Sequence, residues 1–283
     1  MKTKLPAKIG YKKTPKIQRA FDSYGKTTTK EFQDKNRDKL IIHPDKIKLS
    51  GDGVFFTIQG EGPTTGQPAV FCRLHVCNLQ CTWCDAWYTW QRETPEFWTE
   101  SNDYAIPVLA QMLEDAWQCD NKTKKRVVFT GGEPTLQRNQ LTLLLPFLIK
   151  DKEGWAVEME TNGTLMPTEE MLRVIQFNCS PKLENSKNPR ELRIKPKVLQ
   201  ALNGVNTMFK FVVMTEADVE EVERDFVKDI GLDPNKVALM PQGVTTEELN
   251  INMARVAEIC KRKGYRMFSR LHVNIWGGAL RKV

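Results

Sequence analysis

The feature that most constrains the fold is a repeated alternation of short apolar segments with amphipathic segments along the chain. Segments rich in β-branched and aromatic residues predict strands at Val54–Ile58, Ala69–His75, Val127–Thr130, Trp155–Glu160, Gln176–Cys179, Met208–Val213, Val237–Met240 and Tyr265–His272. Amphipathic segments between most of these strands predict helices. Strands separated by helices indicate a parallel sheet, and about six successive strand–helix units are too many for a small two-layer domain. The sequence therefore predicts an α/β fold, a partial (β/α) barrel.

Three positions mark helix boundaries. Pro107 suits the first turn of a helix, because the N–H that proline lacks has no intrahelical partner there. Thr168 is a predicted N-cap residue. Gly264 is predicted to close the helix that begins at Thr245 or Thr246.

Polar or glycine-rich clusters directly follow four of the predicted strands. These clusters are Cys77–Cys84, Gly131–Pro134, Glu160–Gly163 and Ser180–Lys182. In a barrel of parallel strands the carboxyl ends all meet at one face, and that face carries the chemistry of such folds. We therefore expect the four clusters to line one functional site.

The net charge of +7 is confined to the N-terminal part of the 283-residue chain. Residues 1–40 contain 12 basic and 4 acidic residues, a net charge of +8, which leaves 30 basic and 31 acidic residues in the body. The sequence predicts a basic extension over residues 1–46, partly disordered and solvated, and one folded domain over residues 47–283. Contact of residues 1–40 with nucleic acid is a hypothesis that this charge permits.

The composition of the chain limits the cellular locations that are expected for it. No stretch approaches the roughly 18 apolar residues of a membrane span, and no secretory signal is recognisable, so neither membrane insertion nor secretion is expected. The chain contains seven cysteines, an odd number, and three of them lie within eight residues. This pattern favours a reducing, cytoplasmic location and a metal centre over a disulfide framework.

The three clustered cysteines form a C-x3-C-x2-C array of Cys77, Cys81 and Cys84. Three thiolates can hold three irons of a cubane cluster, whereas a fully ligated cluster uses four cysteines. A fourth iron without a protein ligand is a vacant coordination position, which is typical of a catalytic metal. A structural zinc site completed by His75 or Asp85 is the alternative, and the downstream clusters disfavour it. The remaining cysteines are predicted to pack as small apolar side chains: Cys72, Cys119, Cys179 and Cys260.

The cysteine array, with Trp83 before its last cysteine, resembles the signature of radical S-adenosylmethionine (SAM) enzymes, and Gly131–Pro134 resembles the glycine motif with which they bind SAM. Further motifs resemble one family within them, the 7-carboxy-7-deazaguanine synthases. These motifs are Thr57–Gly62, Phe71–Leu74, Cys84-Asp85, Glu160–Thr164, Ser180–Lys182, Leu271-His272 and Trp276-Gly277. The resemblance extends from about residue 47 to the C-terminus.

The resemblance implies a radical SAM lyase that converts 6-carboxy-5,6,7,8-tetrahydropterin to 7-carboxy-7-deazaguanine with loss of ammonia. This is a step of 7-deazapurine (queuosine-type) biosynthesis. It implies a [4Fe-4S] cluster, SAM as a regenerated cofactor, a reduced version of the barrel, and a homodimer. The pterin and an electron donor such as a flavodoxin-like protein are the expected partners.

The resemblance also implies roles for individual residues, with the cluster held by the three cysteines of the array. The SAM-binding residues would be Trp83, Gly132, Glu133, Thr161, Ser180, Pro181 and Lys182, and the substrate-binding residues Ile58, Gln59, Gly60, Arg73 and Thr130. The planar guanidinium of Arg73 suits a bidentate grip on a carboxylate, although a core ion pair would also explain it. The Gln59 amide can both donate to and accept from a pterin edge. His272 is interpreted as a packing residue without a chemical role.

One residue departs from the family pattern. Family members carry serine or threonine directly after the Cys-Asp pair, and its hydroxyl helps to hold Mg²⁺ against the substrate carboxylate, but this chain has Ala86 there. Water could replace the hydroxyl, or Asp85, Thr89 or Arg73 could compensate for a lost site. We therefore expect weakened or absent Mg²⁺ dependence.

Two other functions fit parts of the sequence. Enzymes that place a glycyl radical on a partner protein also use C-x3-C-x2-C, but the motifs around Gln59 and Ser180 speak against that function. The second is a zinc-stabilised nucleic-acid-binding module with residues 1–40 as its basic arm. That alternative leaves the clusters after the other strands unexplained.

Overall fold

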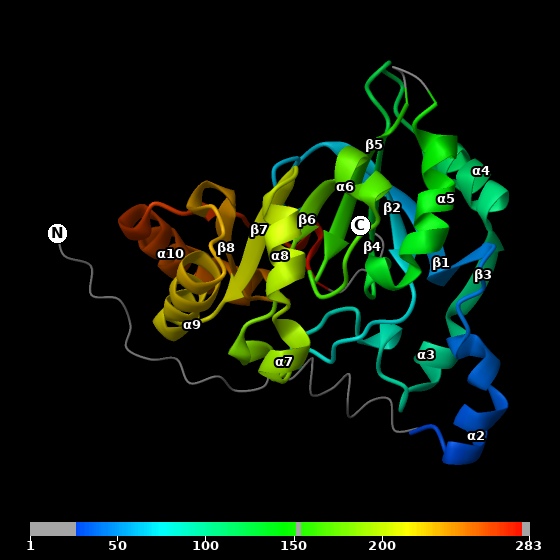
Figure 1. The fold of residues 1–283 in the computed structure, drawn as a ribbon, viewed down its shortest axis with the longest axis horizontal. Coiled ribbons are helices and arrows are strands. Elements are labelled where there is room, and N and C mark those ends of the chain that lie inside the picture. Colours follow the sequence, from blue (N-terminus) through cyan, green and yellow to red (C-terminus); the bar gives the residue numbers. More distant parts are fainter. Residues whose placement is uncertain (1–26, 151–153, 279–283) are drawn as a thin grey trace.

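The computed structural model describes residues 27–150 and 154–278, and its centre is one mixed sheet (Figure 1). Within the described ranges the sheet has nine strands in the order β3-β1-β2-β4-β5-β6-β7-β8-β9. The strands are β1 (Lys46–Ile58), β2 (Pro68–Leu74), β3 (Ser101–Ala105), β4 (Arg126–Gly131), β5 (Ala156–Thr161), β6 (Gln176–Cys179), β7 (Thr207–Val213), β8 (Val237–Pro241) and β9 (Arg266–Met267).

Helices connect most of the strands. The α-helices are α2 (Lys30–Lys35), α3 (Pro95–Thr99), α4 (Ile106–Ala116), α5 (Arg138–Leu148), α6 (Glu169–Val174), α7 (Arg190–Arg193), α8 (Pro196–Asn203), α9 (Glu216–Glu221), α10 (Thr246–Lys263) and α11 (Leu271–Trp276). Short 3₁₀ segments are η1 (Arg37–Leu40), η2 (Trp87–Thr89), η3 (Pro134–Gln137), η4 (Glu184–Ser186) and η6 (Pro234–Lys236), and η5 (Val222–Asp229) is a π-helical continuation of α9.

The predicted α/β fold is confirmed. From β2 through β4, β5, β6, β7 and β8 to β9, every neighbouring pair is parallel, whereas β1 pairs antiparallel with both β2 and β3. Within the described ranges β3 and β9 are the two edges of the sheet and do not pair with each other. The result is a partial barrel of parallel strands, extended at one edge by an antiparallel pair.

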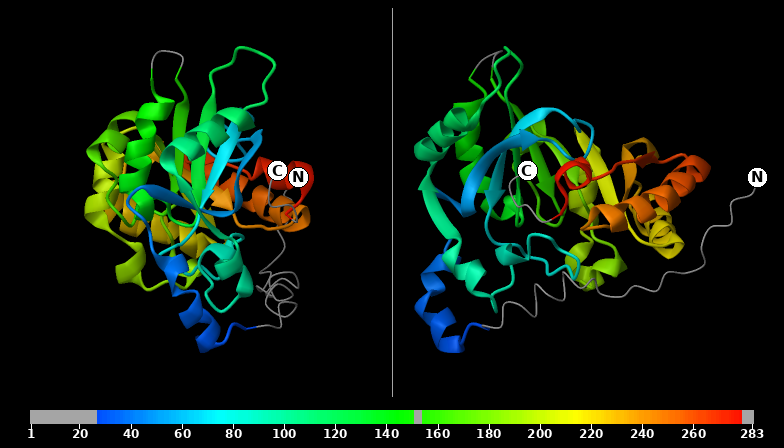
Figure 2. Two further views of the ribbon diagram at one scale, coloured as in Figure 1. Left: turned by 90° about the vertical axis from the view of Figure 1, so that its right-hand side faces the viewer. Right: turned by 180° about the vertical axis from the view of Figure 1, so that it is seen from behind.

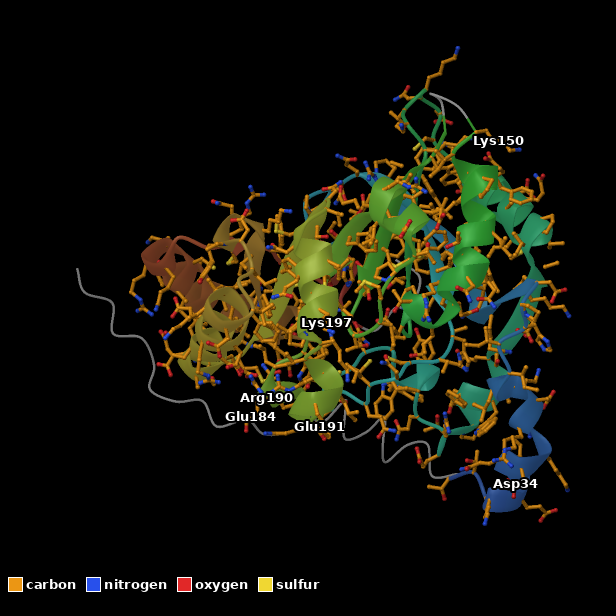
Figure 3. All side chains as sticks on the ribbon, in the orientation of Figure 1. Asp34, Lys150, Glu184, Arg190, Glu191 and Lys197 are labelled. Carbon is orange, nitrogen blue, oxygen red and sulfur yellow. The ribbon has the colours of Figure 1, made fainter. Side chains whose placement is uncertain are left out.

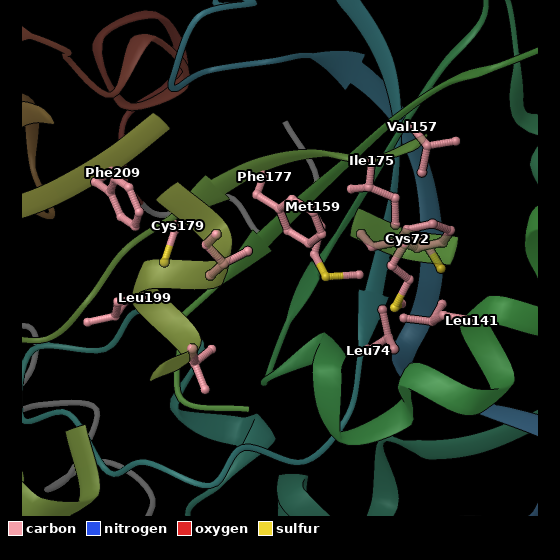
Figure 4. Packing of buried hydrophobic residues seen from close by; sticks show 14 of the residues in the cluster. Cys72, Leu74, Leu141, Val157, Met159, Ile175, Phe177, Cys179, Leu199 and Phe209 are labelled. Atoms are coloured by element: carbon pink, nitrogen blue, oxygen red, sulfur yellow. The ribbon is translucent and has the colours of Figure 1, made fainter. Parts of the chain in front are cut away.

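Alternation along the parallel strands gives the sheet two different faces. On β4 to β7, one set of side chains is apolar and joins a core with the helices, while the other set includes Thr130, Glu160, Asn178 and Lys210. Figure 4 shows the apolar set, with Leu141 of α5 and Leu199 of α8 packed near strand residues. Seen from behind in Figure 2, α11 lies on the opposite face, away from α5, α6 and α8. The polar side chains are therefore left on the face that bears α11.

The marked helix boundaries are confirmed. Pro107 lies in the first turn of α4. The hydroxyl of Thr168 accepts a hydrogen bond from the backbone N–H of Met171 at 3.3 Å, as an N-cap residue does. Gly264 ends α10 in the left-handed conformation with φ 77°.

The expected strand at Tyr265–His272 is wrong over most of its length. Only Arg266–Met267 pairs with β8, and α11 begins at Leu271. The N–H of Leu271 donates to the carbonyl of Gly60 at 2.9 Å, so this segment leaves the sheet edge and contacts the loop after β1. The other expected strands form, and β1 reaches back to Lys46. Tertiary contacts thus override a local strand pattern at the C-terminal end.

Part of the predicted N-terminal extension is folded against the body. The N–H of Thr28 donates to the carbonyl of Glu93 at 2.8 Å, and Lys39 Nζ lies 3.4 Å from the carbonyl oxygen of Ser101. Residues 1–26, with most of the basic charge, lie outside the described residues, so the nucleic-acid hypothesis stays a prediction. Among the helices of the described ranges, none has the length and apolar character required to span a membrane.

Candidate active site

A cavity of about 300 Å³ lies at the carboxyl ends of the parallel strands. It is lined by residues from β1, β2, β4, β5, β6, β7 and β8, by the loop after β2, and by the start of α11. Among its lining residues are nearly all of the predicted site residues: Ile58, Gln59, Arg73, Cys77, Cys81, Trp83, Cys84, Thr130, Gly132, Glu133, Thr161, Ser180 and Lys182. Gly60 and Pro181 are not part of the lining, although their neighbours are. The four sequence clusters therefore meet at one site, as expected.

The loop that carries the three cysteines is anchored to the segment around η4 and α7. Asn188 accepts from the backbone N–H of Gln80 at 2.9 Å, and its amide lies 3.3 Å from the sulfur of Cys81. Burial raises the pKa of Cys77 to about 12, and nearby Glu133 adds to the effect. A thiol with such a pKa is protonated at neutral pH, so iron must displace its proton on binding.

The donor set fits an iron–sulfur cluster. All seven cysteines are free thiols, and Cys77, Cys81 and Cys84 share the cavity. Within the described ranges no three side chains of the metal-ligating types are arranged around a single ion. Three thiols in one loop that line one cavity suit a cubane, because each thiolate can bind a different iron. Cys72 and Cys179 are buried in the core, which confirms their predicted packing.

The glycine motif makes a close backbone contact with the end of β2. A Cβ on Gly132 would lie 2.0 Å from the carbonyl oxygen of Val76, and one on Gly131, whose φ is 109°, would lie 2.2 Å from that of Leu74. The N–H of Gly132 donates to Leu74 and that of Glu133 to Val76, both at 2.9 Å. Gly132 is a predicted SAM-binding residue, and its N–H is already paired with backbone. The glycines are required because β4 lies directly against the chain that enters the cysteine loop.

Glu133 joins the ends of β4 and β5. Its carboxylate is 1% exposed and accepts from the hydroxyls of Thr135 and Thr161 at 2.6 Å each and from the N–H of Asn162 at 2.7 Å. The amide of Asn162 in turn donates to Asn78 in the cysteine loop at 2.9 Å. This chain of contacts fixes three strand ends relative to one another.

The third cluster places a cation beside the cysteine loop. Lys182 Nζ donates to the hydroxyl of Ser180 at 2.9 Å and lies 5.3 Å from the ring centroid of Trp83. The Trp83 indole N–H donates to Asn185 at 3.2 Å. Residues far apart in the sequence thus present a hydroxyl, an ammonium and an aromatic ring to the same part of the cavity.

The predicted substrate residues lie at the other side of the cavity. Gln59 is 1% exposed, and its amide accepts from the N–H of Glu61 at 3.1 Å. The Arg73 guanidinium lies 5.3 Å from the centroid of the Phe55 ring. A Cβ on Gly60 would lie 2.0 Å from Nδ1 of His272, so the imidazole packs directly on this glycine, as its predicted packing role requires.

The cavity also contains a buried charge network that was not predicted from the sequence. Lys210 of β7, 2% exposed, donates from Nζ to Glu61 at 2.9 Å and lies 3.7 Å from Glu160. Burial opposes ionisation of Glu61, but the charges of Lys210 and Arg270 lower its pKa and keep it a carboxylate. The sequence could have indicated this network, because Lys210 lies between two phenylalanines in a predicted strand. Alternation along a strand places such a lysine on the face opposite the apolar core.

Arg270 completes this network at the start of α11. Its Nε donates to Glu61 at 3.1 Å, an Nη1 N–H donates to the carbonyl of Gly243 at 3.0 Å, and Nη2 forms an ion pair with Asp85. Asp85 directly follows the last cysteine of the array. The guanidinium therefore connects the cysteine loop to the loop after β1.

The chain is similar to known radical SAM proteins, and in particular to 7-carboxy-7-deazaguanine synthases. Residues 73–178 match the Radical SAM superfamily. The 7-carboxy-7-deazaguanine synthase of Pyrobaculum aerophilum is 36% identical over 229 residues, which cover 80% of this chain and 94% of that protein. The enzyme of the same name from Halobacterium salinarum is 33% identical over 248 residues and is covered to 90%. The crystal structure of QueE from Escherichia coli shares the fold, with a TM-score of 0.58 at 24% identity over 80% of this chain and 95% of that chain.

We expect Gly132→Ala to destabilise the protein and to impair cluster binding. The new methyl group would collide with the Val76 carbonyl, and overpacking of this kind costs about 1–3 kcal/mol. Urea unfolding and iron content after anaerobic reconstitution measure the two effects. Gly204→Ala is the matched control, because its Cβ would have its nearest neighbour at 3.4 Å. Equal iron content in the two variants would contradict the proposed contact.

We expect Lys210→Met to lower the free energy of unfolding by about 3 kcal/mol, because Glu160 loses its counter-charge and Glu61 keeps only Arg270. The exposed Lys261, paired with Glu258 at 2.9 Å, provides the control variant Lys261→Met. That change should have little effect, because exposed ion pairs contribute little. Similar urea midpoints for both variants would show that the network around Lys210 does not stabilise the fold.

Proposed function

This chain belongs to the 7-carboxy-7-deazaguanine synthase family of the radical SAM superfamily, and we propose that it converts 6-carboxy-5,6,7,8-tetrahydropterin to 7-carboxy-7-deazaguanine with loss of ammonia. It is a radical SAM lyase of deazapurine biosynthesis. The observation that carries this conclusion is the convergence of the cysteine array and the family's strand-end motifs on one cavity. No observation favours the glycyl-radical or zinc-module alternatives.

The cofactors follow from the family and fit the residues present. Cys77, Cys81 and Cys84 would hold three irons of a [4Fe-4S] cluster and leave the fourth iron for SAM. When bound, the cluster and SAM would supply the radical chemistry that removes a hydrogen atom from the substrate. Ser180 and Lys182 offer a hydroxyl and an ammonium to the polar groups of SAM, and the Trp83 ring lies beside them.

The substrate would bind on the β1 and β2 side of the cavity. The forked guanidinium of Arg73 suits the carboxylate of the pterin. Gln59 and Thr130 offer an amide and a hydroxyl to the ring edge, and each is held by a glutamate: Gln59 Nε2 lies 3.4 Å from Glu158, and Thr130 donates to Glu160 at 2.7 Å. Because both partners are charged and Glu158 is fully buried, the polar groups are held in place before the substrate arrives.

The side chains do not fit the Mg²⁺ site of the family. Ala86 offers no side-chain oxygen, and the hydroxyl of Thr89 donates to the Ala86 carbonyl at 2.7 Å. Asp85 is already paired with Arg270. Mg²⁺ prefers an octahedral set of oxygen ligands. We therefore propose that turnover depends weakly on Mg²⁺ or not at all.

The partners are proposed on the same basis. A flavodoxin-like electron donor and a homodimer follow from family analogy, and seven free cysteines favour a reducing cytoplasm. The surface around η4 and α7, which anchors the cysteine loop, carries both signs of charge at Glu184, Arg190 and Glu191 (Figure 3). We therefore expect a donor that docks there to meet a mixed surface rather than a uniformly basic one.

The test is anaerobic reconstitution followed by metal analysis and an assay with SAM, a reductant and the pterin. We expect about four irons per chain and consumption of the pterin. Cys84→Ala should abolish turnover, whereas Cys119→Ala, outside the cavity lining, should retain it. About one zinc and no iron would support the binding module instead. Cleavage of SAM without pterin consumption would show that the substrate assignment is wrong.

A further inference from the structure

Arg270 occupies the part of the cavity next to the residue that departs from the family pattern. Its side chain is 14% exposed, and its guanidinium lies between Asp85 and Glu61. Asp85 immediately precedes Ala86, the position at which the family pattern given above has serine or threonine. The positive charge of Arg270 therefore lies against Asp85, directly beside the position that lacks a side-chain hydroxyl.

The guanidinium of Arg270 neutralises negative charge at Asp85 and Glu61. Without Arg270, Asp85 would lose its ion pair with the guanidinium and Glu61 would keep only Lys210, at 2.9 Å. The cavity would then gain net negative charge, which would repel an incoming substrate carboxylate and attract a divalent cation. With Arg270 in place, both carboxylates are paired. The guanidinium is permanently charged, so this pairing does not depend on pH near neutrality.

The guanidinium also retains capacity for a ligand. Among the described residues its four acceptors are Glu61, Gly243, Asp85 and, at 3.4 Å, His272. A guanidinium has five N–H donors, so one N–H on Nη1 is left. Arg73 and Arg270 both line the same cavity. A substrate carboxylate could therefore bind between two arginines.

We propose that Arg270 is the fixed cation of this active site and positions the substrate carboxylate in place of Mg²⁺. The inference rests on the proposed function, since it assumes a substrate that carries a carboxylate. It makes Arg270 a substrate-positioning residue with no part in hydrogen transfer. It also predicts that removal of the guanidinium lets a divalent metal bind at Asp85 and at the Glu61 oxygen that Lys210 does not hold.

The experiment compares the reconstituted wild-type protein with Arg270→Gln, Arg270→Lys and the double variant Ala86→Thr/Arg270→Gln. Arg266→Gln is the matched control, an exposed arginine on the adjacent β9. Steady-state kinetics are measured after EDTA treatment and during Mg²⁺ titration. Binding of Mn²⁺ alone, followed by electron paramagnetic resonance, is a second measurement that needs no turnover. Thermal unfolding checks that each variant is folded.

We expect EDTA and Mg²⁺ to leave wild-type and Arg266→Gln kinetics unchanged. Arg270→Gln should raise KM for the pterin about tenfold to hundredfold without metal, the range for loss of a hydrogen bond to a charged group, with a smaller change in kcat. Mg²⁺ should reverse much of that loss, most completely in the double variant. Mn²⁺ should bind to both Gln variants and not to the wild type. Arg270→Lys should remain independent of Mg²⁺.

Three results would overturn the proposal: a wild-type protein that requires Mg²⁺, an Arg270→Gln variant that behaves like Arg266→Gln, or a loss in Arg270→Gln that Mg²⁺ does not reverse and that brings no Mn²⁺ binding. The third result would mean that Arg270 only stabilises the contact between the cysteine loop and the loop after β1. Failure of the proposed function looks different, because no protein would then consume the pterin under any condition. The Mn²⁺ measurement would still decide whether Arg270 excludes a divalent ion.

Discussion

The arrangement of the active site depends on one close backbone contact, between the glycine motif after β4 and the end of β2. Gly132 lies so near to Val76 that no side chain fits between them, and two backbone hydrogen bonds hold the segments together. Val76 has a φ of 74°, which a β-branched residue rarely adopts, and Cys77 follows it directly. The contact thus determines the direction in which the cysteine loop leaves the sheet. Glu133 extends the same constraint to the end of β5.

The second organising element is the charge inside the barrel. One face of the parallel strands is apolar and packs against helices, so the other face is free to carry Lys210, Glu158 and Glu160. Buried charges are costly unless they are paired, and here each lies against a partner of opposite sign. Their pairing holds Gln59 and Thr130 in fixed orientations. The network therefore stabilises the fold and arranges the substrate side of the cavity.

Arg270 pairs both with Glu61 of this network and with Asp85, which precedes the residue that departs from the family pattern, Ala86. A cation that the protein carries itself needs no oxygen ligands, so loss of the hydroxyl at position 86 is compatible with an intact substrate site. The same guanidinium joins the cysteine loop to α11 through Asp85 and Glu61.

The sequence by itself determined the α/β class, most strands, and the motifs that meet in the cavity, because strand periodicity, caps and cysteine spacing are local properties. It did not reveal that the segment after Met267 turns into a helix, that the Gly132 N–H pairs with backbone, or that Lys210 and Arg270 complete the site. Glu61 and Arg270 are 209 positions apart, and no local pattern connects them. Only the tertiary structure decided these features. A buried charge selects its partner by proximity in space, and strand order sets that proximity.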